Sequence, residues 1–248
     1  MIVDVHVHLG WDYTFDEDFP REALIDKMNN REIDVQIVQP GQCHDLAIVQ
    51  KQHNAIAELC EEFPGRFFGM ANPTPHLQAD IYNDEITRCV EELGFTSIKL
   101  NPPASGVIPN TKSGRKCFDA ARRHNIPLMV HTAPDSFSDP IGLLDLAKEY
   151  SDVKIIMAHC GMLVSASNAA KMFELCPNVY GDSSWTPGFL IKNWVRTYGP
   201  RIMFATDMEE NARAELAKIR NSDLSEDELS SVLCDTAVDV FNLTNRLS

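Results

Sequence analysis

Eight short apolar runs, separated by longer amphipathic stretches, restrict the fold of this chain more than any other feature. The stretches at 47–63 and 79–94 place apolar residues three and four positions apart, which is helical spacing. Nearly all-apolar strands that alternate with helices belong to a parallel sheet covered on both faces, and eight such units close a barrel. The predicted strands are residues 2–7, 33–40, 66–72, 95–101, 126–132, 153–160, 178–184 and 201–207.

We therefore predict an α/β fold: a single (β/α)8 TIM barrel with C-terminal helices, formed by one domain over residues 1–248. An open doubly wound sheet is the alternative. Against it, no G-x-G-x-x-G string follows the first strand, and the polar residues of interest are spread over the whole chain. The C-terminal helices are expected to pack around the barrel and close it, at 210–220, 225–233 and 236–243.

The composition argues against several classes of function. A net charge of −14 without any block of Lys and Arg disfavours nucleic-acid binding. Seven cysteines without a close C-x-x-C pair fit neither a disulfide framework nor a thiolate zinc site. The first residues lack the basic segment of a signal peptide, and no apolar run approaches the roughly 20 residues of a membrane helix. We expect a cytoplasmic protein without a membrane partner.

The string D-V-H-V-H near the start places two histidines on one face of the first strand. His6 and His8 are two positions apart, so their backbone positions are about 7 Å apart and both imidazoles can reach one ion. An isolated H-x-H is more often a pair of packed core residues than a site. The residues at the ends of the other predicted strands decide between a packed core pair and a metal site.

Four further polar residues lie at the C-terminal ends of other predicted strands: Lys99, His131, His159 and Asp207. In a barrel these ends meet at one mouth, where buried polar groups are costly unless they are paired or bind a metal. Imidazole and carboxylate ligands without a thiolate suit Zn, with Mn and Fe as alternatives. The sequence thus predicts a divalent metal centre, and such a metal can lower the pKa of a bound water to about 7.

The order of these strings resembles the amidohydrolase superfamily: D-x-H-x-H at the start, V-H at strand five, A-H-C-G at strand six and T-D at strand eight. More narrowly, IKLNPP, MAHCG, VYGDSS and MFATDM are similar to the amidohydrolase-related (amidohydrolase 2) branch. That branch includes pyrone dicarboxylate lactonases and aminocarboxymuconate semialdehyde decarboxylase. The resemblance runs from residue 4 to about residue 243.

The resemblance implies roles for five residues. His6, His8 and His131 would be metal ligands, Asp207 a ligand or the base that deprotonates the water, and His159 a ligand or a substrate-polarising group. In the single-metal branch Lys99 would be a cation that binds a substrate carboxylate. In the two-metal branch it would be carboxylated and bridge the ions, with His131 and His159 on the second ion. We favour one ion and an unmodified lysine, although a simple salt bridge is also open.

The chain departs from the family pattern on the substrate side of the site, at Asn101, Met162 and Glu209. Asn101 and Trp185 join Lys99 as substrate-binding candidates, although Trp185 can equally cover the outer rim. Asp182 and Ser184 are expected to shape the mouth of the barrel. The alternative is that Ser183 or Ser184 caps the next helix.

Several other residues are expected to play no part in the chemistry. Cys160 is expected to be a small buried residue rather than a nucleophile. Histidines in predicted loops and helices are expected to be solvated; these are His44, His53, His76 and His124.

These inferences favour an enzyme that hydrolyses an amide, lactone or ester bond of a small molecule with metal-activated water. Non-oxidative decarboxylation of a small unsaturated or aromatic acid is the alternative. A non-catalytic metal-binding barrel and phosphate-ester hydrolysis at a two-metal site remain open. The loops at 10–22 and 101–115 are expected to act as lids that determine the substrate, and a homodimer is the default assembly.

Overall fold

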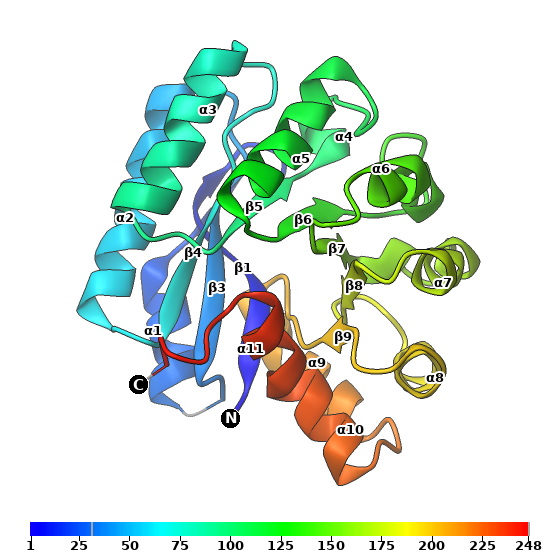
Figure 1. Ribbon diagram of the computed structural model, residues 1–248. Helices are drawn as coiled ribbons and strands as arrows, with labels where there is room; N and C mark the ends of the chain where they lie inside the picture. The colour runs from blue at the N-terminus through cyan, green and yellow to red at the C-terminus, as the bar shows by residue number, and fades with distance from the viewer. Residues whose placement is uncertain (31, 248) are drawn as a thin grey trace.

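A curled nine-stranded sheet forms the centre of the molecule, with helices on its outer side (Figure 1). The computed structural model describes residues 1–30 and 32–247. Eight strands are parallel and are hydrogen-bonded in chain order, as the sequence predicts. They are β1 (Val3–Asp12), β3 (Val35–Pro40), β4 (Phe67–Ala71), β5 (Ser97–Leu100), β6 (Leu128–His131), β7 (Ile155–Ala158), β8 (Val179–Asp182) and β9 (Ile202–Met203).

The two ends of this sheet lie side by side. The backbone N–H of Val5 in β1 donates to the carbonyl of Phe204, at 3.1 Å, and the N–H of Asp207 donates to the carbonyl of His6, at 2.9 Å. The buried Asp4 carboxylate accepts the Thr206 N–H at 3.1 Å and the Thr206 hydroxyl at 2.6 Å. These contacts bring the chain after β9 against β1, so residues from the first and last strands can share one site.

The helices that follow the strands pack on the outer face of the sheet and bury an extensive apolar layer against it. They are α1 (Arg21–Asn29), α2 (Leu46–Glu62), α3 (Ala79–Thr87) with η1 (Arg88–Glu92), α5 (Lys112–His124), η2 (Pro140–Leu143) with α6 (Leu144–Glu149), α7 (Ala166–Leu175), α8 (Gly188–Tyr198) and α9 (Ala212–Arg220). None of the helices in the described part of the chain is long and apolar enough to cross a membrane.

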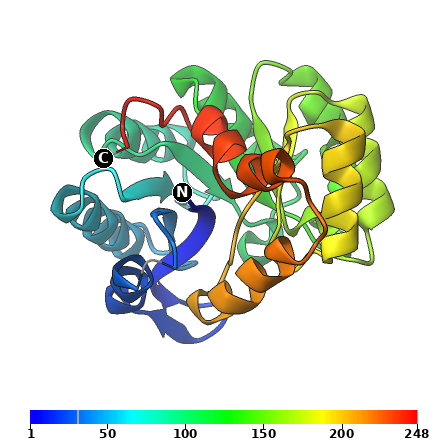
Figure 2. The ribbon, with the colours of Figure 1, turned by 90° about the horizontal axis from the view of Figure 1, so that it is seen from below.

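The last helices pack at the N-terminal end of the sheet, whereas closure of the barrel by them stays a prediction. They are α10 (Glu226–Ser230), η5 (Ser231–Asp235) and α11 (Thr236–Val240). Ala237, Val240 and Phe241 join an inner apolar cluster with Val3 and Val5 of β1. Seen from below, α11 crosses in front of the sheet (Figure 2).

A bulge in β1 aims both predicted metal histidines into the sheet's concave side. Between Asp4 and Val7 the register with β3 shifts by one residue. Val5 belongs to the inner apolar cluster, whereas Val7 belongs to the outer one. Since a bulge inserts one residue and re-aims the side chains that follow, His6 and His8 point inward above an apolar floor.

Two predicted lid loops contain secondary structure that the sequence does not predict. In 10–22, β2 (Glu17–Phe19) pairs antiparallel with the end of β1, placing Asp12 opposite Glu17. In 101–115, α4 (Pro102–Ser105) forms a single turn. The hairpin therefore extends β1 beyond the rest of the sheet.

We predict that Gly41→Ala displaces this hairpin and destabilises the protein. A Cβ at Gly41 would lie 2.4 Å from the carbonyl oxygen of Trp11, a backbone atom that cannot rotate away. Such overpacking costs about 1–3 kcal/mol, or a melting temperature lower by about 5 °C for a chain of this size. Gly142→Ala is the control, because its Cβ would meet no atom of the described residues within 4 Å. Equal melting temperatures for both variants would contradict this account.

Candidate metal centre

Two histidines of β1 and one aspartate after β9 form a triad at the C-terminal end of the sheet. The Nε2 atom of His6 lies 3.2 Å from Oδ1 of Asp207, and Nε2 of His8 lies 3.3 Å from the same oxygen. All three residues are at least nine-tenths buried, and their ligand atoms lie within 4.8 Å of one another. A carboxylate oxygen between two imidazole nitrogens is a donor set suited to a divalent ion.

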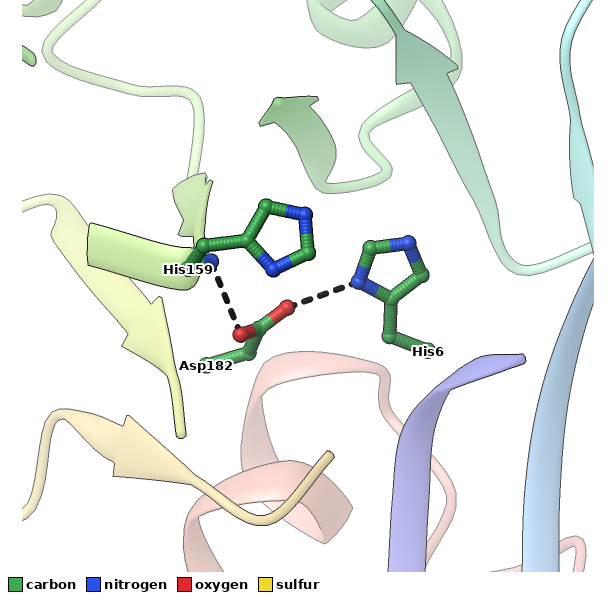
Figure 3. Close-up of side chains that lie close together, drawn as sticks. All are labelled: His6, His159 and Asp182. Atoms are coloured by element: carbon green, nitrogen blue, oxygen red, sulfur yellow. Dashed lines mark hydrogen bonds and ion pairs between the residues drawn. The ribbon is translucent and has the colours of Figure 1, made fainter. Parts of the chain in front are cut away.

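Asp182, at the end of β8, holds His6 in place from the other side of the ring. Nδ1 of His6 lies 2.9 Å from Oδ2 of Asp182, while Oδ1 of Asp182 accepts the backbone N–H of His159 at 2.9 Å. Figure 3 shows Asp182 between His6 and His159, with both contacts dashed. A histidine that donates its Nδ1–H to a carboxylate keeps a free lone pair on Nε2. The sequence does not show that Asp182 orients the ring of His6.

The group of His6, His159 and Asp182 also has ligand atoms within 4.8 Å of one another. It is less suited to an ion than the triad, because both oxygens of Asp182 already have hydrogen-bond partners. Its Oδ1 accepts the Ser184 N–H at 3.1 Å and the Ser184 hydroxyl at 2.6 Å, besides His159. We interpret it as the hydrogen-bonded support of the triad.

His159 begins the short turn η3 (His159–Gly161) after β7, with a left-handed backbone φ of 63°. Its Nδ1 lies 2.8 Å from the hydroxyl oxygen of Ser184, which itself donates to Asp182. The ring therefore donates from Nδ1 and keeps the lone pair of Nε2. Burial lowers the pKa of His159 to about 4, so the imidazole is neutral at pH 7.

His131, at the end of β6, packs against His159, with ring centroids 4.9 Å apart. Burial and then the charges of His159 and Lys99 lower its pKa to about 2. Within the described residues, it belongs to none of the groups of three that have ligand atoms within 4.8 Å. Its role as a ligand therefore stays a prediction.

Lys99 and Gln39 donate hydrogen bonds to the Nε2 atoms of the two triad histidines, His6 and His8. Nζ of Lys99 lies 2.7 Å from Nε2 of His6, and Nε2 of Gln39 lies 2.9 and 2.8 Å from Nε2 of His6 and of His8. Burial lowers the pKa of Lys99 to about 8 against the opposing charges of Asp207 and Asp182. The Oε1 atom of Gln39 is buried and has no hydrogen-bond partner among the described residues. A bound cation would satisfy the same lone pairs, so the residues present fit a metal.

Trp185 contacts the second oxygen of the triad carboxylate. Its indole Nε1–H donates to Oδ2 of Asp207 at 2.8 Å, and its side chain is about half exposed. Both residues have a left-handed φ, 58° for Trp185 and 63° for Asp207. Positive φ at non-glycine residues is costly and is concentrated at functional sites. Trp185 therefore lies against the triad, and its role as a pocket wall stays a prediction.

The other predicted residues near the mouth have mainly structural contacts. The Asn101 side chain accepts the Ala104 N–H at 3.4 Å and caps α4. The proposed helix cap at Ser183 or Ser184 is wrong, since α8 has no side-chain cap and Ser184 bonds Asp182 instead. Cys160 is fully buried, and burial raises the pKa of its thiol well above the usual range, as expected for a packing residue.

His53 corrects the expectation that the outlying histidines are solvated. It is fully buried between α2 and α3, where Nδ1 lies 2.7 Å from Oε1 of Glu85 and Nε2 accepts the Asn72 N–H at 3.1 Å. Cys89 lies close enough to complete a third metal-like group with His53 and Glu85. Because both ring nitrogens are already used, we interpret this group as a structural hydrogen-bond network. All seven cysteines lie in the described part of the chain and are free.

Asp12 is a further buried carboxylate that sequence reasoning missed. Its Oδ2 lies 4.0 Å from Nδ1 of His8, a nitrogen that has no hydrogen-bond partner in the described structure. The carboxylate accepts backbone N–H groups of Thr14 and Gln42, at 2.7 and 2.8 Å. Asp12 thereby anchors the hairpin beside the triad.

Comparison with known proteins gives a family and a fold. The model of a family described as amidohydrolase matches residues 3–243. A comparison with curated protein sequences found no match. An uncharacterized TIM-barrel protein from Bordetella bronchiseptica superimposes with a TM-score of 0.76 at 13% identity, over 97% of this chain and 98% of that chain.

Two other solved structures carry bound ligands. A variant of 5-carboxyvanillate decarboxylase from Novosphingobium aromaticivorans, with bound manganese and 3-methoxy-4-hydroxy-5-nitrobenzoic acid, has a TM-score of 0.73 at 16% identity, over 98% of this chain and 97% of its own. A protein provisionally named 2-pyrone-4,6-dicarboxylic acid hydrolase, from Acinetobacter baumannii with citric acid bound, has a TM-score of 0.68 at 14% identity, over 97% and 99%. At these identities the likeness shows the fold.

Proposed function

Since the chain belongs to the amidohydrolase family and is an enzyme, we propose that it is a hydrolase that uses metal-activated water on an amide, lactone or ester bond of a small molecule. The observation that carries this proposal is the convergence of His6 and His8 on one oxygen of Asp207, with the His6 ring held by Asp182. Carboxylate-oriented histidines around an open coordination position are typical of catalytic rather than structural metal sites.

His6, His8 and Asp207 would hold the ion, with His131 and His159 as further ligands. A bound divalent ion lowers the pKa of a water from 15.7 to about 7 and polarises a carbonyl oxygen. One ion is favoured over two because the strand-end strings resemble the single-metal branch, in which the lysine at the position of Lys99 is unmodified. Zinc is our first choice of metal, and the manganese of one structural neighbour makes Mn the main alternative.

The residues of the triad and those around it would transfer the proton and bind the substrate. Asp207, whose Oδ2 accepts the Trp185 N–H, would be the base that accepts a proton from water at the site. His159 presents an unprotonated Nε2 toward the triad, because its Nδ1–H is bonded to Ser184. This arrangement suits a ligand or a proton acceptor better than a group that donates to the substrate carbonyl. Lys99, Asn101 and Trp185 are the candidates for substrate binding.

Decarboxylation of a small unsaturated or aromatic acid is the second candidate, because one structural neighbour is a decarboxylase that binds manganese and a nitrobenzoic acid. In that reaction Lys99 would bind the carboxylate that is lost. The fold accommodates both reactions, so the reaction itself has to be measured.

The proposal is tested with metal-loaded protein in ¹⁸O-labelled water. Panels of small lactones, esters, amides and aromatic acids are followed by mass spectrometry. Hydrolysis predicts one ¹⁸O atom in the product and no release of carbon dioxide. Carbon dioxide released without ¹⁸O in the product would replace hydrolysis by decarboxylation. The intact mass shows whether Lys99 carries an added carboxylate, which would indicate two ions.

A closed barrel, the cytoplasmic location and a homodimer complete the proposal. The hydrogen bonds from Val5 to Phe204 and from Asp207 to His6 support closure between β1 and the end of β9. Sedimentation analysis would test the dimer.

A further inference from the structure

Gln39 lies at the C-terminal end of β3, directly beside one histidine of the triad. The register between β1 and β3 pairs Gln39 with His8. Gln39 is 1% exposed. Its Nε2 atom lies 2.9 Å from Nε2 of His6 and 2.8 Å from Nε2 of His8. The Gln39 amide therefore contacts the same two nitrogen atoms that face Oδ1 of Asp207.

The distances from the amide to the two histidines match those between neighbouring ligands of one ion. Ligand atoms about 2.1 Å from an ion lie about 3.0 Å apart in an octahedral site and about 3.4 Å apart in a tetrahedral one. The Gln39 amide lies 2.9 and 2.8 Å from the two histidine nitrogens, and Oδ1 of Asp207 lies 3.2 and 3.3 Å from them. The amide and the carboxylate thus belong to one set of converging atoms.

Hydrogen bonding within the protein does not account for this position of Gln39. The Nε2 atom of an imidazole offers one lone pair or one N–H. Nε2 of His6 has the Gln39 amide at 2.9 Å and Nζ of Lys99 at 2.7 Å, so two donors share one lone pair. Oε1 of Gln39, the acceptor of the same amide, is buried and has no hydrogen-bond partner among the described residues. Since an unpaired buried acceptor is costly, a purely structural role explains the residue poorly.

Resting on the metal-dependent function above, we propose that Gln39 is a further ligand of the ion, through Oε1. The oxygen and nitrogen of an amide are nearly interchangeable in shape, so a half-turn about the last side-chain bond puts Oε1 where Nε2 lies. The oxygen then faces the ion together with His6 and His8. A neutral carbonyl oxygen suits Mn, whereas Zn prefers nitrogen, sulfur and carboxylate ligands. Gln39 therefore determines metal preference, and it raises the affinity for Mn more than the affinity for Zn.

The test measures the affinities of the protein for Mn²⁺ and for Zn²⁺ separately, by competition with a chromophoric chelator. In Gln39→Leu, which removes the amide, the affinity for Mn should fall at least about 10-fold further than the affinity for Zn. Gln39→Glu keeps an oxygen and adds a charge, so it should bind Mn at least as tightly as the wild type. Gln36→Leu is the control, because Gln36 is buried on the same strand and donates to the carbonyl of Leu24 at 2.9 Å. It should keep the ratio of the two affinities within about 2-fold.

An unchanged ratio of the two affinities in Gln39→Leu would overturn the proposal. An equal loss for both metals would also overturn it, because such a loss indicates a contact that only supports the histidines. If circular dichroism shows that Gln39→Leu is unfolded, Gln39→Glu decides, and weaker Mn binding than in the wild type then contradicts the proposal. Binding is measured without turnover, so a failure in the ¹⁸O experiment leaves this test valid. A wild type that binds neither ion would contradict the proposed function as well, whereas unaffected Gln39 variants would leave that function intact.

Discussion

Replacing His8 by alanine is expected to empty the metal centre and abolish turnover. The wild type should retain about one ion per chain after dialysis, and His8→Ala only a trace, because the variant loses one of three ligand atoms that lie within 4.8 Å of one another. Loss of a supporting contact alone costs about 10–100-fold in metal affinity, so loss of a ligand should exceed that. Elemental analysis and the ¹⁸O assay measure both effects.

His124→Ala is the matched control for this experiment. His124 ends α5, where its Nε2 lies 3.4 Å from the Thr87 hydroxyl, away from the triad. It should retain the metal content and activity of the wild type. A His8→Ala protein with full metal content would show that the triad is not the metal centre.

The positions of the strands were predictable because apolar runs of this length have few other uses. All eight parallel strands lie within or overlap their predicted ranges. The short pieces β2 and α4 were missed, since β2 is the polar tripeptide Glu17–Phe19 and α4 consists of one turn that starts with two prolines. Neither has an apolar periodicity to detect.

The position of polar residues at the C-terminal ends of predicted strands identified the residues that meet at the mouth, but it did not predict their contacts. Strict alternation would place Val5 and Val7 on the same face, whereas the bulge in β1 separates them. The sequence VHVH contains no sign of that bulge. The pairing of His53 with Glu85 was equally hidden, because it joins residues 32 positions apart on different helices.

Asp182 shows the same limit within the site. Its position at the end of a strand suggested a residue that shapes the mouth, but its contact with His6 spans 176 positions and depends on the curl of the sheet. Once the distance of 2.9 Å to Nδ1 is known, a specific role follows, since this contact determines which nitrogen of His6 carries the proton.

We therefore expect Asp182→Asn to weaken metal binding about 10–100-fold while the fold is retained. The asparagine oxygen can still accept the N–H groups of His159 and Ser184, as the aspartate does at 2.9 and 3.1 Å. Its amide, however, would donate to Nδ1 of His6. That contact favours the tautomer with the proton on Nε2, which removes the lone pair that faces Asp207.

Competition with a chromophoric chelator measures the metal affinity, and Asp119→Asn is the control. Asp119 lies on α5 and accepts the Tyr150 hydroxyl at 2.8 Å, so the same chemical change is made outside the site. Thermal denaturation of the metal-free proteins should show similar melting temperatures for Asp182→Asn and the wild type, because burial alone raises the pKa of Asp182 and makes its charge costly. Unchanged metal affinity in Asp182→Asn would mean that the tautomer of His6 is determined by other contacts, and a large fall in melting temperature would assign Asp182 to the fold rather than to the metal centre.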